Sequence, residues 1–135
     1  TTKRLAFQKL LKQASAIVLG PGLGQSRWSK WLFKKTITHL SRHHVPCIID
    51  ADALNLLAQN SVAIKQLKKN NQCIFTPHPG EAARLLNTTI QKIQSARTDT
   101  IKRINQILGG TIVLKGAESL VYTSNQKIFT FLLKS

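Results

Sequence analysis

The sequence contains no methionine and only five acidic residues, against twenty lysines and arginines. Without a methionine, Thr1 is not a translation start, so we expect these 135 residues to belong to a longer chain. No apolar run approaches the roughly 20 residues that a membrane-spanning helix requires. Residues 1–15 form a basic amphipathic stretch without the apolar region of a signal peptide. We therefore expect no association with a membrane.

Cysteine is also scarce. The two cysteines, Cys47 and Cys73, each open a short apolar run, and their spacing matches no metal-binding motif. This arrangement is typical of buried, reduced thiols in a cytoplasmic protein. The sequence leaves a disulfide between them open as the alternative.

The scarcity of acids gives a net charge of +15, which admits two interpretations. One is attraction to polyanions such as nucleic acid or nucleotides, and the other is a basic but otherwise ordinary surface. The cations are spread from Lys3 to Lys134 without a dense block, and the few aromatic residues are not interleaved with them. We expect no nucleic-acid partner, and a basic nucleic-acid-binding module stays the alternative from another functional class.

Short continuous apolar runs alternate with helical segments along the chain. The predicted strands are 16–19, 46–49, 73–76 and 111–114, and the predicted helices are 27–43, 53–59, a stretch up to 69, 81–86 and 91–108. Residues 119–123 and 127–132 are typical of two paired antiparallel strands. The pattern predicts an α/β fold, with a mainly parallel sheet and helices on both faces, in one domain without a linker.

Four unusual segments follow the predicted parallel strands. Ligands of open α/β sheets bind beyond the carboxyl ends of the strands, so these segments are the candidate site. The first, Gly20–Gly24, lets a backbone approach a ligand, although it is neither a dinucleotide-binding fingerprint nor a Walker A loop. An ordinary tight turn is the alternative.

The second segment carries Asp50 and Asp52, which could hold Mg²⁺ or orient hydroxyl groups. We expect Asp52 to cap the helix that follows it, and we assign Asp50 to the site. Asn55 lies in the first helical turn and is expected to face the same cleft.

The third segment holds His78 between two prolines, and Glu81 begins a helix. A stiff loop presents a side chain to a ligand at low entropic cost, and a proline-rich turn is the alternative. In the fourth segment, Lys115 ends an apolar strand just before Gly116. Such a lysine can place its charge on a phosphate, or it can simply extend into solvent.

Together the four segments resemble one enzyme family. They are Gly20-Pro-Gly-Leu-Gly24, Asp50-Ala-Asp-Ala-Leu-Asn55, Thr76-Pro-His-Pro-Gly-Glu81 and Leu114-Lys-Gly-Ala117. Their order and approximate spacing are similar to those of the ADP- or ATP-dependent NAD(P)H-hydrate dehydratases, which have a ribokinase-like fold. The resemblance extends from about Ala16 to Thr123.

The resemblance implies that residues 1–135 form the central part of a single ribokinase-like domain. It implies a lyase that repairs the S epimer of hydrated NADH or NADPH by phosphorylation and elimination, with ADP or ATP and Mg²⁺. Bacterial members of the family tend to be homotetramers, and the cytoplasm is the expected location. The implied substrate-binding residues are Gly22, Leu23, Gly24, Asp50, Asn55, His78, Gly80, Glu81 and Arg84, and the implied nucleotide-binding residues are Lys115, Gly116, Ala117, Glu118 and Ser119.

The sequence departs from the family pattern at both ends. The family's Gly-x-Gly-Asp motif, which supplies the anion hole and the catalytic aspartate, would follow Ser135, and its first strands would precede Thr1. We therefore expect residues 1–135 to bind ligand weakly without turnover, and to leave apolar surface uncovered. A ribokinase-like kinase of a vitamin precursor or a sugar, and a folded core without a ligand, remain alternatives.

Overall fold

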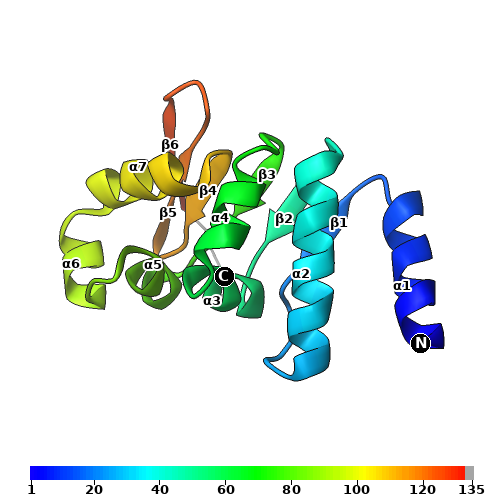
Figure 1. The fold of residues 1–135 in the computed structure, drawn as a ribbon. Coiled ribbons are helices and arrows are strands. Elements are labelled where there is room, and N and C mark those ends of the chain that lie inside the picture. Colours follow the sequence, from blue (N-terminus) through cyan, green and yellow to red (C-terminus); the bar gives the residue numbers. More distant parts are fainter. Residues whose placement is uncertain (133–135) are drawn as a thin grey trace.

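The computed structural model describes residues 1–132, which form a six-stranded sheet with seven helices (Figure 1). In chain order the elements are α1 (Thr2–Gln13), β1 (Ile17–Leu19), α2 (Arg27–Arg42), β2 (Cys47–Ile49), α3 (Asp52–Ala58), α4 (Ser61–Leu67), β3 (Cys73–Phe75), α5 (Pro79–Leu86), α6 (Ile90–Ser95), α7 (Arg97–Leu108), β4 (Thr111–Leu114), β5 (Glu118–Tyr122) and β6 (Ile128–Leu132). The predicted order of strands and helices is confirmed. The N-terminal basic stretch adds the helix α1.

The strands lie in the sheet in the same order as in the sequence, β1 to β6. Neighbouring strands from β1 to β4 are parallel, and β5 and β6 extend the sheet as an antiparallel edge. The four parallel strands therefore end at one edge of the sheet, and the loops that follow β1, β2, β3 and β4 lie side by side. These loops are the four segments singled out in the sequence.

The helices that follow β1 cover one face of the sheet, so the prediction of helices on both faces does not hold for residues 1–132. Each crossover between parallel strands is right-handed, and each one from β1 to β4 leads to the next strand on the same side. Every connecting helix therefore lies on the same face of the sheet. Burial alternates accordingly: Val18, Ile48 and Ile74 are exposed, whereas both neighbours of each are more buried and face the helices. These three exposed side chains leave an apolar row on the other face of the sheet within residues 1–132.

The long helix predicted over residues 91–108 is in fact two helices. Ala96 has φ −144° and ψ 55°, which is not helical, and it separates α6 from α7. The break allows Arg97 to begin α7, directly opposite the turn between β4 and β5. A break at an alanine has no signature in a sequence, because alanine is the best helix former.

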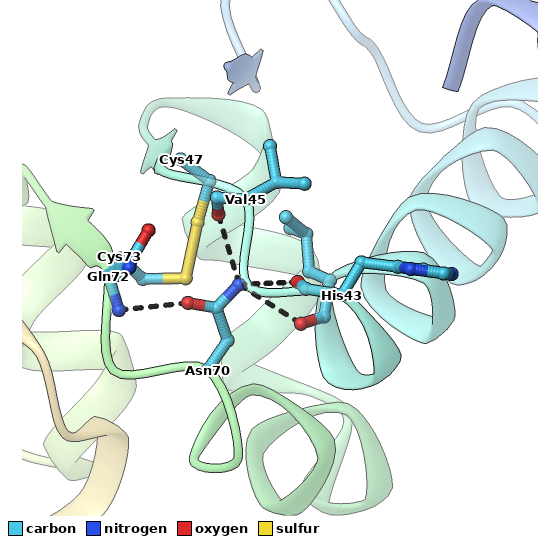
Figure 2. The surroundings of a disulfide bond; sticks show 7 residues. His43, Val45, Cys47, Asn70, Gln72 and Cys73 are labelled. Atoms are coloured by element: carbon cyan, nitrogen blue, oxygen red, sulfur yellow. Dashed lines mark hydrogen bonds between the residues drawn. A yellow bond between two sulfur atoms is a disulfide. The ribbon is translucent and has the colours of Figure 1, made fainter. Parts of the chain in front are cut away.

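The expectation of reduced thiols is wrong, since Cys47 and Cys73 are joined in a disulfide (Figure 2). The register of β2 and β3 pairs the two residues directly, which directs both side chains to the same face of the sheet. Register between strands 26 residues apart cannot be seen in the sequence. Within residues 1–132, no helix combines the length and the apolarity needed to cross a bilayer.

Candidate active site

The glycine loop after β1 packs directly on the end of β2. Gly20 has φ +133°, and a Cβ atom at this position would overlap the carbonyl oxygen of Asp50. Only glycine fits such an approach between two backbones. At the other end of the loop, the backbone N–H of Gly24 donates a hydrogen bond of 2.8 Å to the Oδ2 atom of Asp52. The loop is thus fixed at both ends to the segment that follows β2.

This contact corrects the role expected of Asp52. The N-cap position of α3 belongs to Ala51, which makes no side-chain cap, and Asp52 is the first residue of the helix. Its carboxylate holds the glycine loop instead. Ala51 has φ +49°, a conformation that costs a residue with a side chain on the order of 1–3 kcal/mol. Backbone strain of this kind, between two carboxylates, is typical of functional sites.

Asp50 and Lys115 form an ion pair across the strand ends. The Nζ atom of Lys115 lies 2.9 Å from Oδ1 of Asp50, and the two residues are 65 positions apart in the sequence. The side chain of Asp50 is 23% exposed and that of Lys115 is 43% exposed. The Lys115 side chain therefore remains partly accessible to a further anion while the carboxylate holds its position.

Opposing effects act on the pKa of Asp50. Burial raises this pKa, whereas hydrogen bonds from Lys115, Thr76 and the backbone of Ala51, together with the Lys115 charge, lower it. The net result is a pKa below the ordinary value for aspartate. Asp50 is consequently a carboxylate at neutral pH and functions there as an acceptor rather than as a proton donor.

Backbone hydrogen bonds link each loop of the site to the next. The N–H of Asp50 donates to the carbonyl of Leu19 at 3.0 Å, and the N–H of Thr76 donates to the carbonyl of Ile49 at 3.2 Å. The N–H of Lys115 donates to the carbonyl of Pro77 at 2.9 Å. The four strand ends thus form one continuous edge, as expected if the four segments contribute to a single site.

His78 and Glu81 form a capping box at the start of α5. The Nδ1 atom of His78 accepts hydrogen bonds from the N–H groups of Gly80 and Glu81, and Glu81 Oε1 accepts from the N–H of His78. Because Nδ1 is an acceptor, the neutral ring carries its proton on Nε2, which lies 3.3 Å from Glu81 Oε2. Glu81 is buried, whereas the His78 side chain is 51% exposed. The ring therefore fixes the loop and still presents a face to solvent.

Gly80 is needed beneath this ring, because a Cβ atom there would lie 2.8 Å from Cε1 of His78. One turn further along the same helix, Arg84 of α5 donates from Nη1 to Oδ1 of Asn55 in α3 at 2.9 Å. Two predicted site residues that are 29 positions apart are thereby brought together on adjacent helices.

Arg97 is a site residue that sequence reasoning missed. From the start of α7 its guanidinium donates to the carbonyls of Leu114, Lys115 and Glu118, at 3.2, 3.4 and 2.7 Å. It packs so closely that a Cβ atom on Gly116 would lie 2.9 Å from Nη2. In the sequence Arg97 is one of several basic residues in a helical stretch, and no local pattern distinguishes it from the others.

A cavity of about 250 Å³ lies beside this arginine. It is lined by Gln94, Arg97, Gly116, Ala117 and Glu118. Three of the five residues expected to bind nucleotide therefore border a real hollow, and Lys115 precedes them. Ser119 differs from this expectation, because its side chain is buried and its hydroxyl group has no hydrogen-bond partner among the described residues.

Within residues 1–132, no cluster of three or more histidine, cysteine or acidic side chains is arranged to hold a metal ion. The carboxylates nearest the strand ends, Asp50 and Asp52, are engaged by Lys115 and by the glycine loop. The arrangement can bind anions through a lysine, an arginine-supported turn and exposed glycine backbone. It is suited to phosphorylated ligands.

Solved structures show the same fold. A ribokinase-like protein of Enterococcus faecalis superposes with a TM-score of 0.79 at 27% identity, covering 96% of this chain and 43% of that one. An ADP/ATP-dependent NAD(P)H-hydrate dehydratase of Bacillus subtilis, co-crystallised with ATP and Mg²⁺, gives 0.69 at 26% identity, covering 92% of this chain and 43% of that one. A hydroxyethylthiazole kinase of Pyrococcus horikoshii, at 15% identity and a TM-score of 0.69, shares the fold alone.

Sequence relatives are more specific. The bifunctional NAD(P)H-hydrate repair enzyme of Escherichia coli is 44% identical over 111 residues, which are 82% of this chain and 20% of that protein. The ADP-dependent (S)-NAD(P)H-hydrate dehydratase of Neisseria meningitidis is 38% identical over 116 residues, 85% of this chain and 38% of the relative. The chain thus spans about a fifth to two fifths of these relatives. Residues 1–134 match the sequence profile described as NAD(P)H-hydrate dehydratase, and the chain belongs to this family.

Proposed function

We propose that this chain provides the binding edge of an ADP- or ATP-dependent lyase that repairs the S epimer of hydrated NADH or NADPH. The observation that carries the proposal is the pair formed by Asp50 and Lys115 at the carboxyl edge of the sheet. It places a lysine whose side chain is 43% exposed at the strand ends, beside the turn held by Arg97. Relatives with this activity in their names support the same function.

In this proposal the two ligands occupy neighbouring parts of one edge. The hydrated dinucleotide lies against the glycine loop and the exposed face of the His78 ring, with Asn55 and Arg84 at its border. The adenine nucleotide lies beside the cavity of Gly116, Ala117 and Glu118, with a phosphate near Lys115. Mg²⁺ enters with the nucleotide, held mainly by phosphate oxygens, which is how proteins usually bind it in phosphoryl transfer.

The residues described here contribute positioning and charge to the reaction. In phosphoryl transfer a protein acts almost entirely through these two effects. Lys115 supplies the charge, Asp50 holds it in place, and Arg97 fixes the turn against which the nucleotide lies. A cytoplasmic homotetramer is the assembly that we propose, since bacterial proteins resembling this one tend to form it. Sedimentation of the intact protein tests that assembly.

The activity is tested by incubating the intact protein with hydrated NADH and either ADP or ATP. We expect the absorbance of reduced nicotinamide to recover only when nucleotide is present, and only for the S epimer. Phosphorylation of a vitamin precursor or a sugar, without any recovery of reduced nicotinamide, would support the ribokinase-like kinase instead. Asp50→Asn and Lys115→Ala are expected to reduce the recovery, whereas Lys65→Ala is a surface control.

A further inference from the structure

A second cavity lies far from the candidate active site, between α1 and α2. Its volume is about 310 Å³, comparable with small-molecule pockets in other proteins. Because α2 runs from the carboxyl end of β1 back to the amino end of β2, its last turn lies at the edge of the sheet opposite to Asp50 and Lys115. The cavity opens beside this last turn.

The lining of this cavity is basic and holds no acidic side chain, and its Lys35 lies 5.9 Å over the Trp31 ring. Lys12 of α1 and Lys35 and Arg42 of α2 contribute three permanent charges, and His39 and His43 contribute two imidazoles. The two rings stack with their centres 4.4 Å apart. None of the five acidic residues of the chain lines the cavity, and none of the three cations forms an ion pair within residues 1–132.

Basic residues often gather at helix C-termini because their charge offsets the negative end of the helix dipole. Two carbonyls in the last turn of α2 already have partners, since that of His39 accepts from the N–H of His43 and that of Leu40 accepts from Asn70. The side-chain amide of Asn70 donates to the carbonyls of Leu40 and Val45 at 3.0 and 3.1 Å and to that of His43 at 3.4 Å (Figure 2). The C-terminal ends of α1 and α2 together carry about one negative charge from their dipoles, whereas Lys12, Lys35 and Arg42 carry three permanent positive charges. The cavity therefore keeps a positive excess.

Aromatic contacts hold the two walls of the cavity together. The rings of Phe7 in α1 and Trp31 in α2 meet edge to face with centres 5.9 Å apart, and Arg4 lies 5.0 Å over Trp31. Trp31 in turn stacks on Trp28. These contacts position Lys12 opposite Lys35 and Arg42 before any ligand arrives, which lowers the entropic cost of binding.

We propose that the cavity between α1 and α2 binds the diphosphate group of a small anion, through Lys12, Lys35 and Arg42 with the His39–His43 pair. Charged nitrogen donors converging from two helices match the several oxygens of such a group. A single phosphate or sulfate would satisfy fewer of them and should bind more weakly.

Protonation of His39 strengthens this site. Burial and the charge of His43 lower the pKa of His39 below its ordinary value, so the empty cavity disfavours the charged ring. The other polar groups that line it are Gln8 and Lys12 from α1, and Lys35, Thr38 and Arg42 from α2. A bound polyanion raises the pKa of His39 again, so the ring gains its charge in the complex. Relative to His39→Gln/His43→Gln, the affinity of the unmodified protein should therefore rise as the pH falls from about 8 towards 6.

Calorimetric titration of inorganic pyrophosphate into the intact protein tests the site. In Lys35→Gln/Arg42→Gln we expect the affinity to fall at least about tenfold, because two charge-assisted hydrogen bonds are lost. The matched control is Lys65→Gln/Lys68→Gln, which removes the same charge from exposed positions on or next to α4 and should change the affinity less than about twofold. Lys35 and Arg42 are exposed and form no ion pair within residues 1–132. The double variant should therefore unfold at the same temperature as the unmodified protein, which would show that its fold is intact.

Two further arms complete the test. His39→Gln/His43→Gln should remove the part of the pH dependence that the histidines cause, while keeping binding at pH 8. In a Lys115→Ala background, ADP that binds more tightly than pyrophosphate would identify a nucleotide as the natural source of the diphosphate, and equal affinities would identify the diphosphate group itself. Equal losses in the cavity and control variants, or no saturable binding to the unmodified protein, would overturn the proposal.

Discussion

Replacing Lys115 with alanine separates a specific phosphate site from the general attraction of a strongly basic protein. In the structure the ammonium group lies 2.9 Å from Asp50 and its side chain is 43% exposed. A charged hydrogen bond to phosphate contributes about 1.5–3 kcal/mol. The affinity for ADP should therefore fall by roughly ten- to a hundredfold.

The cost to stability should be much smaller than the cost to binding. An ion pair with a partner this exposed contributes on the order of 0–1 kcal/mol to folding, because water screens it. Lys115→Ala should consequently unfold within a few degrees of the unmodified protein. A large loss of stability would mean that Lys115 is mainly structural.

The measurement is a titration of ADP into the intact protein at two salt concentrations, with Lys65→Ala as the control. Attraction to the overall charge weakens with salt and barely responds to one lysine. We expect Lys115→Ala to lose affinity at both concentrations and Lys65→Ala to retain it. Equal losses from the two substitutions would refute the assignment of Lys115 to the site.

Three further predictions concern the frame of the site. Gly20→Ala should lower the free energy of unfolding by roughly 2–4 kcal/mol, because its Cβ overlaps the Asp50 carbonyl, whereas Gly22→Ala meets no neighbouring atom and should cost only about 1–2 kcal/mol of backbone strain; chemical denaturation compares them. Arg97→Lys should accelerate amide hydrogen exchange in residues 114–118, since lysine cannot reach three carbonyls at once; unchanged exchange would show that the turn holds itself. The lowered pKa of Asp50 stabilises the fold above about pH 4, and this contribution is lost as the pH falls further, through the folded-state pKa; Asp50→Asn should flatten that part of the stability profile, and a parallel profile would contradict the ion pair.

Local signals in the sequence were sufficient to predict the strands and the loops that follow them. Buried parallel strands are short continuous apolar runs, and 111–114 is a clear example with the observed bounds. What the sequence did not reveal was which side chains meet. Asp52 was expected to cap its own helix, yet its partner is Gly24, 28 positions earlier.

The same limit explains Arg97 and the cysteines. The contacts of Arg97 depend on a helix break at Ala96 that no residue type announces. The pairing of Cys47 with Cys73 depends on the register of two strands. Positions of elements are local properties of a chain, whereas partners depend on three-dimensional packing. The sequence was therefore a better guide to where the candidate site lies than to how it is held together.

The hydrogen bonds that join the loops have a consequence for evolution and for engineering. Leu19 accepts from the segment after β2, Ile49 accepts from the one after β3, and Pro77 accepts from Lys115 at the end of β4. Because each loop takes its position from the loop beside it, neighbouring substitutions should show epistasis rather than independent effects. A loop transplanted alone from a related enzyme would meet the wrong neighbour. Altering specificity at this edge therefore calls for exchanging adjacent loops together.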